Sequence, residues 1–231
     1  MTFDLREKTE SRASFLLRIK EFIGHFGFDA DSTLACISIC RDELCQPFVS
    51  QLKNEWGEAF DLSGLAGLPF AGVTGLTAAS HHAPVVNGKR RILLVGLAHM
   101  GLANDGTFGD VFRPGLNNTS RACGALDLLS NEVENTNLSE APEPVHNDIE
   151  YGWVRKKLWH IATPNLYETT QKTQEIIHKE LISLAESVLG NNDDDYAIFT
   201  GILLHTEDGN HVVEYKSSHI VIDNNVVNSA V

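Results

Sequence analysis

Two cysteines and one histidine are the residues of this chain whose types and positions could do chemistry together. Cys40 follows the apolar run at 34–39, and His99 comes just past a second apolar run at 91–97. Cys123 lies where a helical pattern begins, and the dipoles at a helix start favour a thiolate. Sulfur and imidazole ligands suit zinc, and three protein ligands leave a fourth position for water, as in catalytic zinc sites.

The elements expected around these residues explain why they would meet. The runs at 33–39 and 91–97 are short and apolar, which is typical of buried strands. Strands that alternate with helices predict one α/β domain over residues 1–231, with a mainly parallel central sheet flanked by helices. Ligands of such sheets bind beyond the carboxyl ends of the strands, so Cys40 and His99 are expected at one edge. Periodicity and turn residues predict the remaining elements: helices at 8–26, 42–56, 149–160 and 165–189, a hairpin at 104–115, a connecting loop at 131–150, and a strand, turn and strand at 196–215.

Simpler interpretations compete with this one. A single cysteine or histidine at a strand end is usually a packing or loop residue, and the absence of any CxxC pair argues against a zinc knuckle. Cys36 and Cys45 are expected to be small core residues. The glycine-rich stretch at 64–84 is expected to be a loop that wraps closely around its neighbours. Three scattered histidines are expected on the surface or in packing roles: His205, His211 and His219.

Composition restricts the possible partners. The chain has 231 residues, 42% of them hydrophobic and 21% charged, with a formal net charge of −13. Nucleic acids and anionic membranes need a basic surface, so neither is expected as a partner. No apolar run has the length of a membrane span. The first residues, MTFDLREKTE, lack the apolar core of a signal peptide, which predicts a cytoplasmic protein.

Four motifs in a fixed order carry a resemblance to a known family. They are CRDE at 40–43, GLAGLPFAGVTGLTAASHHAP at 64–84, GLAHMGLANDGTFGDVFRPG at 96–115 and RACGA at 121–125. Together they resemble the low-carbon-dioxide-inducible protein B/C family, the theta-class carbonic anhydrases. The resemblance implies a fold similar to beta-class carbonic anhydrases, a homodimer, and zinc (Zn2+) bound by Cys40, His99 and Cys123.

The resemblance also implies roles for residues around the metal. Asp42 matches the acid that either binds zinc or orients the zinc water, whose pKa zinc lowers to roughly 7. Beta-class enzymes place an arginine two residues after this aspartate, but the chain has Leu44 there. Arg41 or Arg113 would have to hold the carboxylate, with Arg113 slightly favoured. One of the paired histidines, taken as His82, is a candidate proton shuttle.

Three functions follow as hypotheses. The first is a zinc lyase, carbonate dehydratase, that converts carbon dioxide to bicarbonate and back by a zinc-bound hydroxide. The second is a catalytically inactive, zinc-binding subunit of an inorganic-carbon complex. The third is a thiol enzyme with Cys40 as nucleophile, which would leave His99 and Cys123 without a joint purpose.

Overall fold

The structure, a computed structural model, describes residues 8–113, 115–136, 139–144 and 146–230. Most of the N-terminal stretch used for the cytoplasmic expectation, and parts of the expected hairpin and connecting loop, lie outside these residues. The strands are β1 (Glu10–Ser11), β2 (Thr33–Ile39), β3 (Ala59–Asp61), β4 (Val85–Val86), β5 (Lys89–Leu102), β6 (Asp110–Val111), β7 (Ser120–Arg121), β8 (Asp195–Thr206), β9 (Val212–Ile222) and β10 (Asn225–Ala230). The helices are α1 (Arg12–Gly24), α2 (Gln46–Trp56), α3 (Gly72–His82), α4 (Gly124–Asn135), α5 (Ile149–Leu158) and α6 (Leu166–Val188), with short 3-10 turns η2 (Glu43–Cys45), η3 (Leu65–Gly67) and η4 (Gly190–Asn192).

The fold is mixed α/β, with a central and mostly parallel sheet flanked by helices, as the sequence predicts. The strand order is β1-β9-β8-β5-β2-β3, with β10 also paired to β9 and β4 to β5. The four strands β3, β2, β5 and β8 run parallel, and β9 turns back antiparallel to β8. The strands β2, β5 and β8 are almost wholly buried, because helices cover both faces of the sheet.

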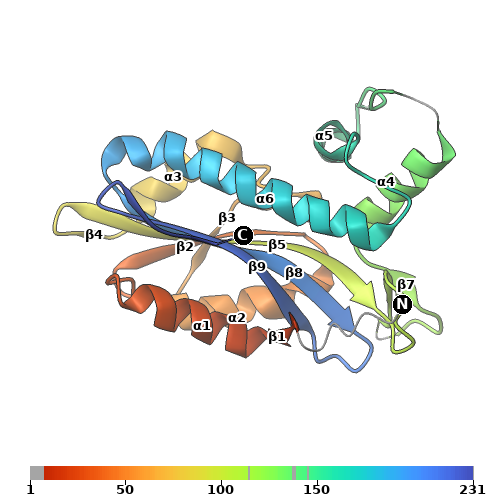
Figure 1. The fold of residues 1–231 in the computed structure, drawn as a ribbon, viewed down its shortest axis with the longest axis horizontal. Coiled ribbons are helices and arrows are strands. Elements are labelled where there is room, and N and C mark those ends of the chain that lie inside the picture. The colour runs from red at the N-terminus through yellow and green to blue at the C-terminus, as the bar shows by residue number, and fades with distance from the viewer. Residues whose placement is uncertain (1–7, 114, 137–138, 145, 231) are drawn as a thin grey trace.

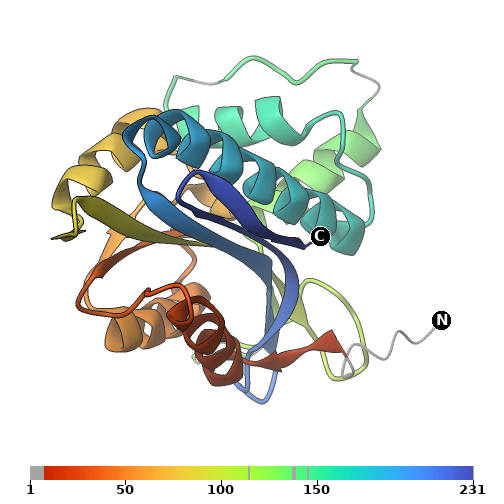
Figure 2. The same cartoon turned by 60° about the vertical axis from the view of Figure 1, so that its left-hand side comes forward.

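The helices form two layers (Figures 1 and 2). α1 and α2 cover one face of the sheet, whereas α3 and α6 cover the other. α4 and α5 pack on the outer side of α6, through Ser130 with Thr169 and Lys157 with Glu180. α1 has this position because Phe15, Leu16, Ile19 and Ile23 repeat at helical spacing and are buried together. No helix in the described ranges is both long and apolar enough to cross a membrane.

The structure corrects two sequence-based expectations about the elements that surround the site. The stretch at 64–84 is not one long loop, because Gly72–His82 forms α3. Burial of Leu76 and Ala79 stabilises this helix despite the glycine at its centre, whose intrinsic cost is about 1 kcal/mol. The strand at 91–97 continues to Leu102, so His99 lies inside β5 and not past its end. The longer strand forms because β8 pairs with it throughout, from Arg91 with Asp195 to Leu102 with Thr206.

Candidate metal centre

Cys40, His99 and Cys123 lie together at the carboxyl edge of the sheet. Their ligand atoms are all within 4.8 Å of one another, and the two sulfur atoms are 3.8 Å apart. Only 4% of Cys40, none of His99 and 1% of Cys123 is exposed to solvent. Three segments far apart in the sequence therefore place two thiols and one imidazole in one buried cluster.

The cluster fits a zinc ion on three counts. Zinc–sulfur bonds of about 2.3 Å at a tetrahedral angle put two thiolates about 3.8 Å apart, which matches the observed sulfur separation. The Nε2 atom of His99 is buried and has no hydrogen-bond partner among the described residues, which is costly unless a further group binds it. Two sulfurs and one nitrogen are soft or borderline ligands, and this favours zinc over magnesium or calcium.

A close approach of backbone segments holds Cys123 beside β5. The N–H group of Gly101 donates to the carbonyl oxygen of Ala122 at 2.9 Å, and the N–H of Gly109 donates to Gly101. A Cβ atom on Gly101 would lie 2.4 Å from the carbonyl oxygen of Asp110, closer than atoms can pack. Glycine at 101 is therefore required for the segment that carries Cys123 to reach His99.

The two thiols do not titrate alike. The hydrogen bond with the Cys123 thiol lowers the pKa of Cys40, although burial acts in the opposite direction. The same hydrogen bond and burial raise the pKa of Cys123 well above its usual range. Both sulfurs bind a metal as thiolates, so metal binding at this cluster is coupled to the release of protons.

Two further groups, from β8 and η2, lie against the cluster. His205 on β8 is fully buried, and its Nε2 lies 2.9 Å from Nδ1 of His99 and 3.9 Å from the sulfur of Cys45. Burial is the main cause that lowers the pKa of His205. His205 was expected on the surface or in a packing role; it is buried, as a packing residue would be, but it also contacts His99, which was not expected. The rule that ligands gather at carboxyl ends of parallel strands, applied to β8 as well as to β2 and β5, would have found it.

Asp42 lies just after Cys40 and is held by two donors. Arg113 donates from Nη2 to Oδ2 at 2.8 Å, and the backbone N–H of Leu44 donates to Oδ1 at 3.0 Å. Arg113 is itself fixed by Glu43, Ser120 and the carbonyl oxygen of Arg121. Among the described residues, the cluster of mutually close ligand atoms contains Cys40, His99 and Cys123 but not the carboxylate of Asp42.

The other two candidates are directed elsewhere. Arg41 donates to the carbonyl oxygen of Ser63 at 3.0 Å and pairs with Glu150 at 3.3 Å. His82 is the exposed last residue of α3, and its ring lies 5.9 Å from that of Phe60. Phe60 pairs with Cys36, which is four residues before Cys40 and hence on the order of 13 Å away along the strand. The structure therefore brings neither side chain to the cluster.

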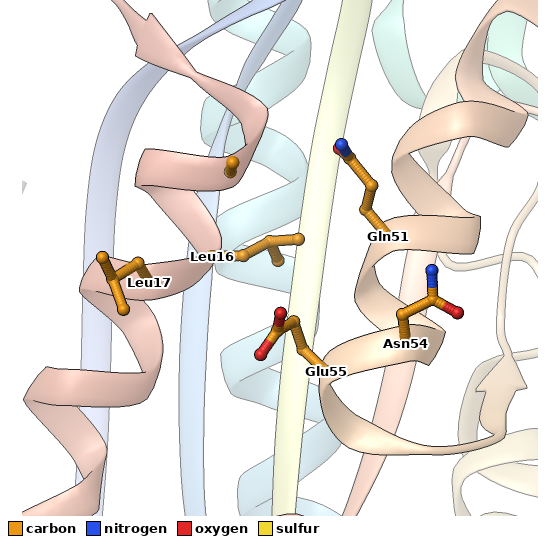
Figure 3. A pocket seen from close by; sticks show the side chains of 6 residues that line it. Leu16, Leu17, Gln51, Asn54 and Glu55 are labelled. Carbon is orange, nitrogen blue, oxygen red and sulfur yellow. The ribbon is translucent and has the colours of Figure 1, made fainter.

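A separate groove of about 150 Å³ lies between α1 and α2 (Figure 3). No thiol or imidazole lines it, so it offers nothing for the chemistry of the cluster. Its lining residues are Ala13, Leu16, Leu17, Gln51, Asn54 and Glu55.

Comparisons with known proteins agree with the resemblance in the motifs. The family model described as limiting CO2-inducible proteins B/C beta carbonic anhydrases matches residues 10–223. The crystal structure of PtLCIB4, a homolog of the limiting CO2-inducible protein LCIB, superimposes with a TM-score of 0.83 at 23% identity, covering 96% of this chain and 95% of that one. The crystal structure of LCIB itself gives a TM-score of 0.77 at 21% identity, with coverage of 96% and 95%. No curated protein matches the sequence.

Proposed function

This chain belongs to the limiting CO2-inducible protein B/C family of beta carbonic anhydrases, and from that premise we propose that it is a zinc-dependent lyase that hydrates carbon dioxide reversibly to bicarbonate. The observation that carries the proposal is the buried cluster of Cys40, His99 and Cys123 beside a carboxylate, Asp42, that an arginine holds. Zinc, when bound, supplies a water whose pKa is lowered to roughly 7.

Asp42 has the properties needed to orient that water. Each carboxylate oxygen has two lone-pair positions, and Arg113 and Leu44 together use only one on each oxygen. A free lone pair remains to accept a hydrogen bond from the nucleophile. Arg113 donates a charge-assisted hydrogen bond to the carboxylate and so fixes its direction.

Zinc content measured together with hydration rate tests the proposal. After dialysis, we expect about one zinc per chain by elemental analysis, because two thiolates and an imidazole supply the three protein ligands of a zinc site with one open position. Stopped-flow hydration of carbon dioxide should far exceed the buffer rate. Cys123→Ser should lose zinc, whereas Cys36→Ser should keep it, since Cys36 is a core thiol whose pKa burial raises to about 12. Unchanged zinc in Cys123→Ser would contradict the ligand assignment.

A second function is favoured by the depth of the site. All three ligands are nearly inaccessible to solvent, as expected of a metal with a structural role. If Asp42 exchanged Arg113 for the metal, the site would be closed, and the protein would be a catalytically inactive zinc-binding subunit of an inorganic-carbon complex. Full zinc with no hydration at any pH supports this second function; a chain without zinc supports a thiol enzyme.

We further propose that the protein works as a homodimer in the cytoplasm, as its family resemblance implies. Exposed apolar side chains near the site, among them Phe112, would then be covered by the second copy. Light scattering of the zinc-loaded protein tests the dimer, and fractionation of cells of the source organism tests the compartment. A monomer at micromolar concentration would contradict the first part.

A further inference from the structure

His205 is a buried imidazole that the proposed reaction does not use. It lies on β8, next to the strand that carries His99, and only the Nε2 atom faces that histidine, at 2.9 Å. The Nδ1 atom of His205 has no hydrogen-bond partner among the described residues. His205 lies near the carboxyl end of its strand and contacts His99, a proposed metal ligand, so we ask what it does there.

The contact with His205 bears on which nitrogen of His99 carries the hydrogen. A neutral imidazole carries hydrogen on one nitrogen only, and a nitrogen that binds a metal must not carry it. Within the part of the chain that the structure describes, the Nε2 atom of His99 has no hydrogen-bond partner, whereas Nδ1 contacts His205. For Nε2 to bind a metal together with the two thiols, Nδ1 must carry the hydrogen and donate it to Nε2 of His205.

We propose that His205 is a positioning residue that fixes the tautomer and ring direction of His99, and so raises the affinity of the site for zinc. The inference rests on the proposed zinc site. Residues that accept a hydrogen bond from a metal-binding histidine keep its ring oriented and make it a better ligand.

Sheet geometry explains why these two rings meet. In the parallel pair of β5 and β8, His99 is opposite Leu203, and Gly101 is opposite His205. Residues two apart on a strand share a face, so His205 and His99 point to the same side of the sheet. Because Gly101 has no side chain, no group at that position separates the two imidazoles, whose ring centres are 5.1 Å apart.

A competing arrangement would use the same atoms as a second metal site. Cys45, His99 and His205 also have ligand atoms within 4.8 Å of one another. However, two nitrogens bound to one tetrahedral zinc lie about 3.3 Å apart, since each bond is about 2.0–2.1 Å. The observed 2.9 Å is the usual length of a hydrogen bond between nitrogens and is too short for an ion between them.

Zinc affinity without substrate provides the test. Full-length wild type, His205→Gln and His205→Leu are compared by competition with a chromophoric chelator at one pH. Glutamine offers an amide acceptor near the position of Nε2, whereas leucine offers none. We expect the zinc affinity of His205→Leu to be about 10–100-fold lower than that of wild type. The zinc affinity of His205→Gln should stay within about threefold of the wild-type value. His219→Leu is the matched control, because His219 is a buried histidine on β9 that also has a partnerless Nε2.

Nitrogen-15 NMR of the zinc-loaded protein reads the tautomer directly. Wild type should show a protected Nδ1–H proton on His99, and this signal should be lost or shifted in His205→Leu. Equal zinc affinity and an unchanged His99 spectrum in His205→Leu would overturn the inference, as would an equal loss in His219→Leu. Zinc lost in Cys45→Ser but kept in Cys123→Ser would place the metal in the competing arrangement and also overturn it. If wild type binds zinc but does not hydrate carbon dioxide, the proposed function is wrong, but the inference about His205 is unaffected.

Discussion

Arg113 and Asp42 form an ion pair of 2.8 Å although they are 71 residues apart in the sequence. The pair forms because β6 and β7 bring Arg113 beside the turn that follows β2, where Glu43 and Ser120 also bind its guanidinium. In beta-class enzymes the arginine comes from the same turn as the aspartate; here that position is Leu44, and a distant segment supplies the guanidinium.

Arg113→Lys should reduce hydration even though it keeps the charge. The guanidinium binds four groups in a fixed plane, and an ammonium cannot reproduce that geometry. Loss of a charge-assisted hydrogen bond of about 1.5–3 kcal/mol corresponds to a rate about 10–100-fold lower in stopped-flow hydration.

Arg41→Lys is the matched control for that experiment. Arg41 contacts Ser63 and Glu150 and not Asp42. The rate at which the Arg41→Lys variant hydrates carbon dioxide should therefore stay close to that of wild type. If Arg41→Lys lost activity and Arg113→Lys did not, the assignment of the arginine that holds Asp42 would be wrong.

Asp42→Asn should keep zinc and lose most hydration. The asparagine side chain still accepts from the N–H of Leu44, so the cap of η2 is retained, but it lacks the charge that pairs with Arg113. Asp42→Ala removes the cap as well and should cost about 1 kcal/mol more in stability. Elemental analysis and stopped-flow hydration are measured on the same samples. Loss of zinc in both variants would make Asp42 the fourth ligand of the metal.

Gly101→Ala should weaken both the fold and the zinc site. The added Cβ would lie 2.4 Å from the carbonyl oxygen of Asp110, so backbone must move, at a cost of roughly 1–3 kcal/mol. The movement would also disturb the hydrogen bond from Gly101 to Ala122, which positions Cys123. Urea unfolding in chelator and zinc competition are the measurements. Gly24→Ala, with open space at its Cβ, should be neutral, and equal behaviour of the two variants would contradict this account.

His178 should make stability depend on pH. Burial, with smaller effects of His219 and Lys179, lowers the pKa of His178 to about 4. Its Nδ1 lies 3.1 Å from the hydroxyl oxygen of Thr200, which also accepts a hydrogen bond from the amide of Gln174. The unfolded chain takes up this proton near pH 6.5 and the folded chain only near 4. Stability from His178 is therefore complete above about pH 6.5 and is lost as pH falls toward 4, at most about 3 kcal/mol.

Urea unfolding of zinc-loaded wild type and His178→Gln, at several pH values from 7.5 to about 4, measures this effect. The variant should lose less stability than wild type over that range. Parallel pH curves for the two proteins would show that folding does not lower the pKa of His178.

The sequence by itself determined the chemistry of the ligands and the elements that carry two of them. The apolar runs before Cys40 and His99 have few alternatives to buried strands, and parallel strands bring their carboxyl ends together whatever the rest of the fold is. The helix predicted after Cys123 is likewise confirmed as α4. These are local or general properties, so residue type and order were sufficient to predict the fold class and to propose the ligands.

Tertiary structure alone decided how these residues are held. The length of β5 depends on its pairing with β8, and burial makes a helix of 72–82 against the local preference of its glycines. The pairings of His205 with His99 and of Arg113 with Asp42 join residues 106 and 71 positions apart. Such contacts depend on strand register and on the path of loops, which arise from the packing of the whole domain. The rule for carboxyl strand ends could place His205 near the site, but it could not specify the contact of His205 with His99.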